Sequence, residues 1–295
     1  MNAAESGAEL FAALLIGLLA GGIGSVVGVG GGFIAVPAMT FFLRLPPQAI
    51  IGASLAMVFF NALSGSIAFF RQRRIDLSSG WKFALATFPG SLLGSRVADY
   101  FTSKSFNMVF GFLLLLIAVL MWLQKGKEQN EPEAAGAEAI GAETGVTVQQ
   151  PANRPETVRW GAVRREITDV CGVKYSYEFN LLWGILFSFL VGFISSVLGI
   201  GGGIIHVPFL IMVLGFPPHV AAATSLFVLT WTSLTGMAAH FWLGHVDIKL
   251  ASFLAAGGIV GAQLGACISR HLSGRGIIKI FAGLLVVAGC RMILG

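Results

Sequence analysis

The sequence has little charge. Only 11% of its 295 residues are Asp, Glu, Lys or Arg, whereas 56% are hydrophobic and the mean hydropathy is +0.82. A soluble domain carries charge on about a quarter of its positions, so this composition excludes an ordinary soluble fold. The apolar residues form runs that approach the ~20 residues needed for a membrane-spanning helix, although some are shorter. We therefore expect an all-α, polytopic membrane protein with about 8 to 10 membrane segments.

Cysteine is also scarce, and the first residues lack basic side chains. Cys171 lies in a polar stretch, whereas Cys267 and Cys290 lie in or beside apolar runs, so their spacing fits neither a metal site nor a disulfide framework. We expect no metal and no other cofactor. The N-terminus contains Glu5 and Glu9 but no Lys or Arg, unlike the start of a cleavable signal peptide. The first apolar run should therefore remain in the mature protein.

The formal net charge of +5 does not indicate a nucleic-acid partner. Its basic residues stand at the ends of apolar runs and in one polar linker, without a patch of interleaved aromatic residues. Lys and Arg at such positions are typical of cytoplasmic loops in membrane proteins. The expected surroundings are a lipid bilayer, and nothing in the sequence indicates an oligomeric state.

The chain contains an internal repeat at an offset of 171 residues. Residues 21–76 and 192–247 align without a gap and share 21 identities in 56 positions, which indicates duplication. Identical pairs include Ser25/Ser196, Pro46/Pro217, Pro47/Pro218, Ser54/Ser225, Gly65/Gly236 and Asp76/Asp247. Internal repeats are common in secondary transporters. We predict a membrane repeat at 1–124, a linker at 125–178 and a second membrane repeat at 179–295.

The distribution of basic residues predicts the direction of the repeats. Residues 71–74 contain three arginines, whereas the equivalent loop contains His245; in the next loop the second half is the more basic, with Arg270, Arg275 and Lys279. Because basic residues mark cytoplasmic loops, equivalent loops should lie on opposite sides of the membrane. The repeats are then inverted, the linker is cytoplasmic and both termini are periplasmic. Each half crosses an odd number of times, either with its first three segments all crossing or with a re-entrant pair.

The linker divides into two parts. Residues 128–150 are rich in Glu, Ala and Gly and poor in large apolar residues, which predicts disorder. Residues 156–171 place Val158, Val163, Ile167 and Val170 among charges. This part is either a plain tether or an amphipathic helix on the membrane surface.

A glycine cluster occurs at the same place in both halves, at residues 28–32 and 199–203, and Pro37 or Pro208 follows it. It fits neither a dinucleotide fingerprint, since Phe33 stands where the third glycine is needed, nor a phosphate loop, since it has no lysine. Glycines spaced by four residues also let membrane helices pack closely, which we favour for Gly90/Gly94 and Gly261/Gly265. The denser clusters predict a broken helix or re-entrant half-helix. The second helix would direct free N–H groups toward mid-membrane, where they attract anions.

Neutral polar residues near the clusters complete the predicted site. No Lys, Arg, Asp or Glu lies centrally in the clearly assigned spans. Hydroxyls and amides can replace the hydration of a small oxyanion, although many Ser and Thr side chains bond to their own helix instead. The predicted substrate-binding residues are Ser25, Gly28, Gly30, Gly31, Gly32, Ser54, Asn61, Ser196, Gly199, Gly201, Gly202, Gly203, Thr224 and Ser225.

His206 follows the second cluster within its motif, where the first has Ala35. A buried imidazole can titrate near neutral pH, so His206 is either a proton carrier for coupling or a hydrogen-bonded structural residue. His240 takes the position of Phe69, closer to a helix end, and is the weaker candidate for the same role.

The duplicated pattern GxGGGxxxVP at residues 28–37 and 199–208, with the Pro-Pro pairs and Ser54/Ser225, resembles the TauE/SafE family of sulfite and organosulfonate exporters. The likeness covers about residues 10–123 and 180–295 and excludes the linker. It implies movement of small sulfur-containing anions, such as sulfite, sulfoacetate or related sulfonates, across the bacterial inner membrane.

Together these observations predict a secondary transporter that binds its anion between the two clusters and rocks one repeat against the other. The alternatives are an anion channel and a membrane scaffold that acts through the linker. An enzyme is disfavoured because the apolar runs offer no central carboxylate pair, Cys/His pair or metal cluster.

Overall fold

The computed structural model describes residues 7–27, 29–43, 45–124, 147–149, 162–170, 172–269 and 274–294. The first half contains α1 (Gly7–Val27), α2 (Gly32–Phe42), α3 (Pro47–Arg71), α4 (Leu77–Val97), the 3-10 helix η1 (Ala98–Tyr100) and α5 (Ser103–Gln124). Three strands follow, β1 (Thr147–Gln149), β2 (Ala162–Thr168) and β3 (Lys174–Asn180). The second half contains α6 (Leu181–Leu198), α7 (Gly203–Met212), α8 (Pro218–Trp242), α9 (Ile248–Ser269) and α10 (Gly274–Leu294).

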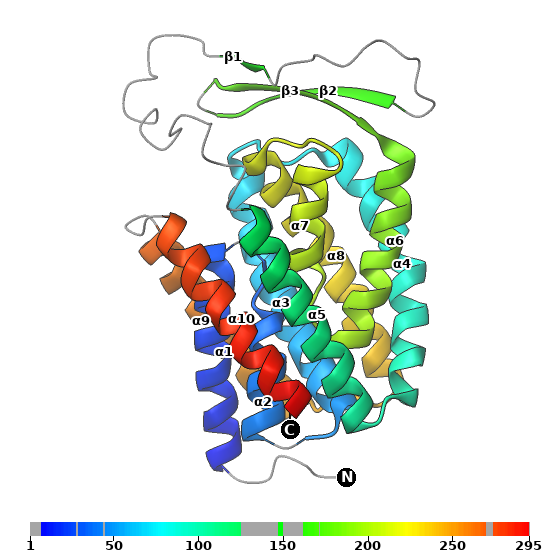
Figure 1. Cartoon of the computed structure of the whole chain (residues 1–295), viewed down its shortest axis with the longest axis vertical. Helices are drawn as coiled ribbons and strands as arrows, with labels where there is room; N and C mark the ends of the chain where they lie inside the picture. Colours follow the sequence, from blue (N-terminus) through cyan, green and yellow to red (C-terminus); the bar gives the residue numbers. More distant parts are fainter. Residues whose placement is uncertain are drawn as a thin grey trace.

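The helices confirm the prediction of an all-α, polytopic membrane protein. Within the described residues, four helices are long and apolar enough to cross a membrane, namely α1, α3, α6 and α8. Shorter apolar helical segments lie in α2, α5, α7, α9 and α10. Figure 1 shows the helices as one bundle, with the three strands above one end; α1 begins and α10 ends at the other end.

Helices from the two halves interleave. The first long helix of each half packs against the fourth helix of the other, α1 against α9 and α6 against α4, while α3 packs against α8 and α5 against α10. In Figure 1, α1 rises toward the strands and α6 descends from them. These opposed directions agree with inverted repeats, and inversion of the complete repeat stays a prediction.

Glycines hold the interleaved pairs close together. A Cβ atom on Gly90 of α4 would lie 2.9 Å from the backbone nitrogen of Phe193 in α6. Gly94 and Gly261 face neighbouring backbone in the same way. The packing role predicted for Gly90, Gly94 and Gly261 is therefore confirmed, whereas the surroundings of Gly265 lie outside the described residues.

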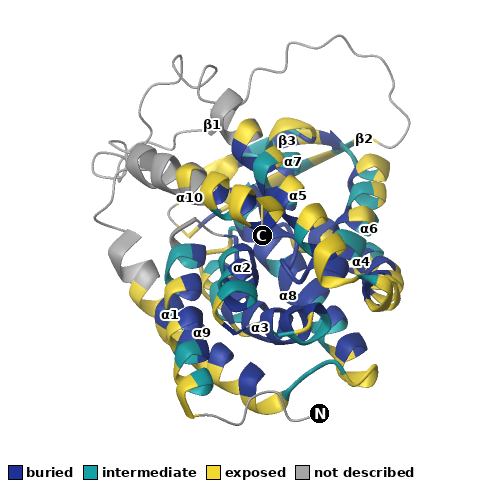
Figure 2. Cartoon of the chain, turned by 60° about the horizontal axis from the view of Figure 1, so that its bottom comes forward, coloured by how far each residue is buried: buried dark blue, intermediate teal, exposed yellow. Residues whose placement is uncertain are grey.

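The central helices are the most buried. Figure 2 shows α3 and α8 largely dark blue in the middle of the bundle, while α1, α4, α6 and α9 present yellow, exposed residues at its sides. Apolar side chains at the periphery, such as Leu85, Phe112 and Leu182, are exposed, as lipid-facing residues of a membrane protein are.

The linker contains a small sheet in the order β1-β3-β2. β2 and β3 form an antiparallel hairpin, and β1 pairs parallel to β3. The prediction of an amphipathic helix in residues 156–171 is wrong for residues 162–168, which form β2. Val163 and Ile167 are four residues apart, a spacing that places them on one face of a helix and equally on one face of a strand. Most of the predicted disordered segment lies outside the described residues, and residues 147–149 of it form β1.

Candidate functional site at the two glycine breaks

Each half contains a helix break at its glycine cluster, as the sequence predicts. α1 ends at Val27 and α2 begins at Gly32, while α6 ends at Leu198 and α7 begins at Gly203. The backbone is left-handed at equivalent positions, with φ of 93° and 81° at Gly30 and Gly31 and of 81° and 85° at Gly201 and Gly202. L side chains rarely adopt such angles, so glycine is required there. Gly28 lies outside the described residues.

The helices after the breaks turn back toward the end from which the long helices started. α2 has 11 residues and α7 has 10, which at 1.5 Å per residue is about half of a membrane. Gly31 at the start of α2 lies against Ala20 and Gly24 of α1. Figure 1 shows α2 at the lower end of the bundle and α7 just below the strands. This geometry favours the re-entrant alternative over a crossing by α2 or α7.

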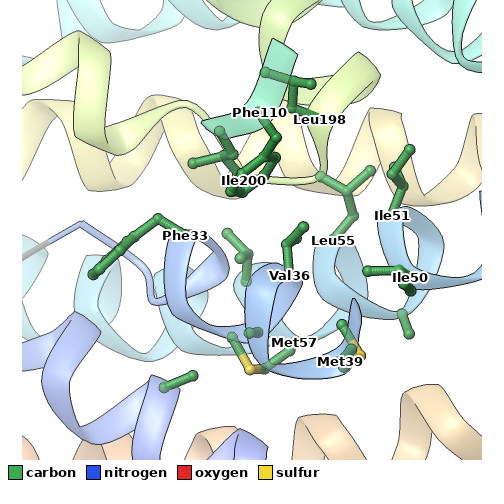
Figure 3. Close-up of a cluster of buried hydrophobic side chains, with 14 of the residues drawn as sticks. Phe33, Val36, Met39, Ile50, Ile51, Leu55, Met57, Phe110, Leu198 and Ile200 are labelled. Carbon is green, nitrogen blue, oxygen red and sulfur yellow. The ribbon is translucent and has the colours of Figure 1, made fainter. Parts of the chain in front are cut away.

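The two breaks meet in the centre of the molecule. A Cβ atom on Gly32 would lie 2.7 Å from the carbonyl oxygen of Ile200, and one on Gly203 would lie 2.8 Å from that of Val29. Val58 and Leu229, which are equivalent at the 171-residue offset, pack against the glycines of both breaks. Figure 3 shows Ile200 beside the side chains of α2. The start of each half-helix thus faces backbone carbonyls of the other half.

Asn61 and Ser25 form a hydrogen-bond network at the first break. Ser25 Oγ donates to Asn61 Oδ1 at 2.9 Å, and Asn61 Nδ2 donates to the carbonyl oxygen of Gly30 at 3.1 Å. Three predicted residues are therefore brought together around one carbonyl. Their counterparts differ: Thr232, equivalent to Asn61, lies 2.9 Å from its own helix carbonyl at Val228 and 3.0 Å from Thr87 Oγ1 on α4.

Ser54 and His206 make side-chain hydrogen bonds at the second break. Ser54 Oγ of α3 donates to the carbonyl oxygen of Gly199 at 2.8 Å, so it joins the two halves. His206 is 2% exposed, with Nδ1 3.3 Å from Ser225 Oγ and Nε2 3.3 Å from Ser188 Oγ. Because Ser188 donates its hydroxyl proton to Gly184, the imidazole Nε2 donates to Ser188 and Nδ1 accepts from Ser225. A neutral ring fulfils both contacts, which favours the structural alternative for His206.

Two buried hydroxyls in the last turn of α6, which precedes the second break, have no partner among the described residues. Among the described residues, the buried Oγ atoms of Ser195 and Ser196 make no hydrogen bond, although both side chains are 0% exposed. The Cβ atom of Ser195 lies 3.4 Å from the Cβ position of Gly202, the residue that precedes α7. Ser196 is a predicted binding residue, whereas Ser195 is not among the predicted set. An unpartnered buried hydroxyl costs about 1–3 kcal/mol, so these two indicate a site for something that accepts or bridges hydrogen bonds.

Other hydroxyls of the central helices bond to their own backbone. Thr230 and Ser233 donate to the carbonyls of Leu226 and Leu229, four residues earlier in α8. The alternative that some Ser and Thr side chains serve only their own helix is confirmed for Ser233. Thr224 instead accepts a hydrogen bond from the backbone N–H of Asp76 at 3.0 Å, at the end of α3 nearest the strands.

The hairpin of β2 and β3 is anchored at that same end. Tyr177 donates to Asp76 Oδ2 at 2.9 Å, and Arg74 Nη2 forms an ion pair with Asp169 at 3.3 Å. Burial, followed by the negative charge of Asp76, raises the pKa of Tyr177, so its O–H donor persists at physiological pH. Tyr177 and Phe179 also pack on Phe216, which follows α7. The linker therefore contacts the second half-helix region directly.

One open groove of about 540 Å³ lies apart from the breaks. It runs between α3, α8 and α9 and is lined mainly by apolar side chains such as Phe60, Phe241 and Trp242. None of the predicted binding residues that the structure describes lines it.

Comparisons with known proteins agree with this architecture. The model of the family described as "Sulfite exporter TauE/SafE" matches residues 13–292. The chain is 33% identical to "Probable membrane transporter protein YunE" of Bacillus subtilis over 95% of this chain and 96% of that protein. It is 25% identical to a probable membrane transporter of Methanocaldococcus jannaschii over 95% and 94% of the two chains. It is 23% identical to "Sulfite exporter TauE/SafE family protein 3" of Arabidopsis thaliana over 90% and 74%. No solved structure gives a significant match. The match over nearly the whole chain means that this membrane protein belongs to the TauE/SafE family of transporters.

Proposed function

We propose that the chain is a secondary transporter of small sulfur-containing anions, with sulfite, sulfoacetate or related organosulfonates as the substrate class. The observation that carries the proposal is the meeting of the two glycine breaks at the centre, with Ser195 against Gly202 and the hydroxyl of Ser196 against Gly236 of α8. Among the described residues, neither hydroxyl has a hydrogen-bond partner. The family membership and the names of relatives support the substrate class.

The second break region provides two kinds of hydrogen-bond donor and one helix dipole for an oxyanion. Ser195 and Ser196 supply hydroxyls that have no other partner in the described residues. The first N–H groups of α7 lack partners within their helix, and its positive dipole end lies at the same place. Such a site needs no fixed positive charge, so the anion that it binds can also be released. Sulfite and sulfonates present several oxygen acceptors that match such a set.

The interleaved packing changes the motion that we propose. Rocking one intact repeat against the other would separate α1 from α9 and α4 from α6, whose glycine contacts bring backbones together. We propose instead that these two mixed pairs move as bodies, while the half-helices α2 and α7 separate at the central contact. Alternating access then opens the second break to one side at a time.

The proposed orientation follows the basic residues. Arg71, Arg73 and Arg74 lie at the end of α3, and Arg74 pairs with Asp169 of the linker. Because basic residues mark cytoplasmic loops, we propose that the linker is cytoplasmic and that both termini are periplasmic in the bacterial inner membrane.

Labelling with a membrane-impermeant maleimide tests this orientation. Two single-cysteine variants are compared after the three native cysteines are replaced by serine: Glu166→Cys on the exposed side of β2, and Tyr100→Cys in η1, where the native side chain is 85% exposed. The thiol at position 100 should react in cells whose inner membrane is intact. The thiol at position 166 should react only after that membrane is permeabilised. The opposite pattern would reverse the orientation.

The test of function is flux in proteoliposomes. Purified protein should accelerate movement of sulfite or a sulfonate, with saturation at high substrate concentration and counterflow from preloaded vesicles. Flux without saturation or counterflow would favour an anion channel. Flux at the rate of empty liposomes for all members of the substrate class would overturn the proposal.

A further inference from the structure

Three titratable side chains connect the surface to the backbone beside the second break. His240 Nε2 lies 2.9 Å from the carbonyl oxygen of Ser196, and His240 Nδ1 lies 3.0 Å from His245 Nδ1. His245 Nε2 lies 2.9 Å from Asp99 Oδ1. The side chain of Asp99 is 40% exposed and that of His245 16%, whereas His240 is fully buried. The contacts therefore lead from solvent to an internal carbonyl.

The proton count of this chain of contacts is fixed by its two ends. A carbonyl and a carboxylate only accept hydrogen bonds, so His240 Nε2 and His245 Nε2 must both carry protons. The contact between the two Nδ1 atoms needs one more. Two neutral imidazoles hold two protons, but the three contacts require three. Moving the additional proton onto Asp99 leaves the total unchanged, so the geometry is that of a cluster with one bound proton.

The surroundings offer few other charges to balance that proton. The facing helices α3 and α6 carry no titratable residue in residues 47–58 and 181–198. Just before α9, the Asp247 carboxylate accepts from the backbone N–H groups of Lys249 and Leu250. Lys249 and Arg96 are exposed. Asp99 is thus the acidic group in contact with the imidazoles and the natural counter-charge for a proton shared between them.

We propose that Asp99, His245 and His240 form a proton-binding site that holds one proton and connects it to the second glycine break. In the step that carries the proton inward, the N–H bond at His245 Nδ1 breaks and one forms at His240 Nδ1. The positive charge then lies on the ring bonded to Ser196. Loss of the proton to solvent leaves two Nδ1 lone pairs facing each other, so one ring must turn and the contact opens.

The repeat does not contain a second copy of this site. His240 and His245 are equivalent to Phe69 and Arg74, and Asp99 is equivalent to Arg270. The site also lies far from the linker, because α4 begins after Asp76 near the strands and approaches Asp99 after 21 helical residues, about 30 Å. A proton here would enter from the face opposite the strands, the proposed periplasmic side.

The direct test is a histidine titration that does not depend on transport. The intact chain, labelled with 15N-histidine in lipid nanodiscs, is compared with Asp99→Asn, His245→Asn and the control His219→Gln, which changes an exposed histidine of α8. The site requires one bound proton shared by two coupled rings. In Asp99→Asn, the proton affinity of that pair should fall about tenfold or more, and in His219→Gln it should be unchanged. In His245→Asn, the coupling itself should be lost.

Two results of the titration would overturn the site. One is a pair of rings that stay neutral and independent of each other down to about pH 5. The other is a coupled pair whose proton affinity does not change in Asp99→Asn.

Flux measurements then test the connection to the break, which rests on the proposed function. In proteoliposomes, a pH gradient should change wild-type sulfite flux severalfold, and Asp99→Asn should lose this response while keeping substrate counterflow. A response that survives in Asp99→Asn would disprove the connection. Absence of all flux would instead count against the proposed function, and the histidine titration would still decide whether the proton site exists.

Discussion

The two glycine breaks have the same backbone but different side-chain chemistry. Gly30 and Gly31 share their left-handed angles with Gly201 and Gly202. At the first break, Asn61 and Ser25 close a hydrogen-bond network around Gly30. At the second, the equivalent of Asn61 contacts α4, and the hydroxyls of Ser195 and Ser196 have no partner in the described residues.

The difference indicates which part of the duplicated unit can diverge. Glycines at the central contact are fixed because a Cβ atom on Gly32 or Gly203 would meet backbone of the other half, and such backbone cannot turn aside as a side chain can. Polar residues around the contact are not constrained in this way. The first break therefore has its polar groups hydrogen-bonded within the protein, while the second keeps hydroxyl donors for a ligand.

The largest effect should come from adding one methyl group at the central contact. Gly32→Ala and Gly203→Ala place a Cβ atom 2.7 to 2.9 Å from backbone carbonyl oxygens, so each should destabilise the protein by more than the ~1–3 kcal/mol typical of overpacking. Thermal unfolding in detergent measures the loss. Gly283→Ala is the control, since nothing lies within 4 Å of its Cβ position. A large loss of stability for one variant and none for the other would contradict the equivalence of the two backbones.

Removal of the free hydroxyls should affect flux more than stability. Ser195→Ala and Ser196→Ala delete buried groups that have no hydrogen bond to lose, so unfolding temperatures should stay the same or rise. Sulfite flux should fall about tenfold or more, the value of one charge-assisted hydrogen bond. Ser25→Ala is the matched control in the first half, and it should lose stability but retain most of its flux. Wild-type flux in both second-half variants would remove these hydroxyls from the site.

Asn61 and Thr232 provide a comparison within equivalent positions. Asn61→Ala leaves the buried carbonyl of Gly30 and the hydroxyl of Ser25 without their partner, at a cost of about 1–3 kcal/mol. Thr232→Val keeps the shape and removes a hydroxyl that is shared between its own helix carbonyl at Val228 and Thr87 Oγ1. Because Thr87 keeps its hydrogen bond to Ala84, the change should cost less than about 1 kcal/mol. Equal losses in chemical or thermal unfolding would contradict the asymmetry of the breaks.

The sequence was sufficient to predict the elements that local chemistry dictates. Hydropathy predicted the membrane helices, and the dense glycines predicted breaks at equivalent positions. It could not predict that Val58 and Leu229 fill the centre, because apolar residues in an apolar run carry no local signal. The position of Thr224 against Asp76 was equally hidden, since it depends on how α8 packs against α4. Ser195 is one of several hydroxyl residues in the apolar runs, and nothing local distinguishes it as the unpartnered one. The spacing of the apolar residues in the segment that forms β2 fits a helix and a strand equally.

A more local effect should appear at the start of α4, the fourth helix of the first half. Asp76 and Asp247 are equivalent and each caps the fourth helix of its half, but only Asp76 also accepts from Tyr177 of the hairpin. Tyr177→Phe removes one hydrogen bond to a charged group and should cost about 1.5–3 kcal/mol at most, with the ring contacts to Phe216 retained. Proteolysis of the linker measures release of the hairpin. Unchanged cleavage would mean that the ring contacts and the Arg74–Asp169 ion pair hold the hairpin without this hydrogen bond.

The smallest expected change concerns His206, whose counterpart is Ala35. His206→Ala makes the second break resemble the first and removes two 3.3 Å contacts that a neutral ring already satisfies. If the proton site lies at Asp99, His245 and His240, the ratio of flux with and without a pH gradient should stay at its wild-type value in this variant, even where the rate falls. If His206→Ala abolished the effect of the pH gradient on flux, His206 at the second break would be the residue that couples transport to protons. Since both places adjoin the second break, either outcome leaves the first break as the structural partner.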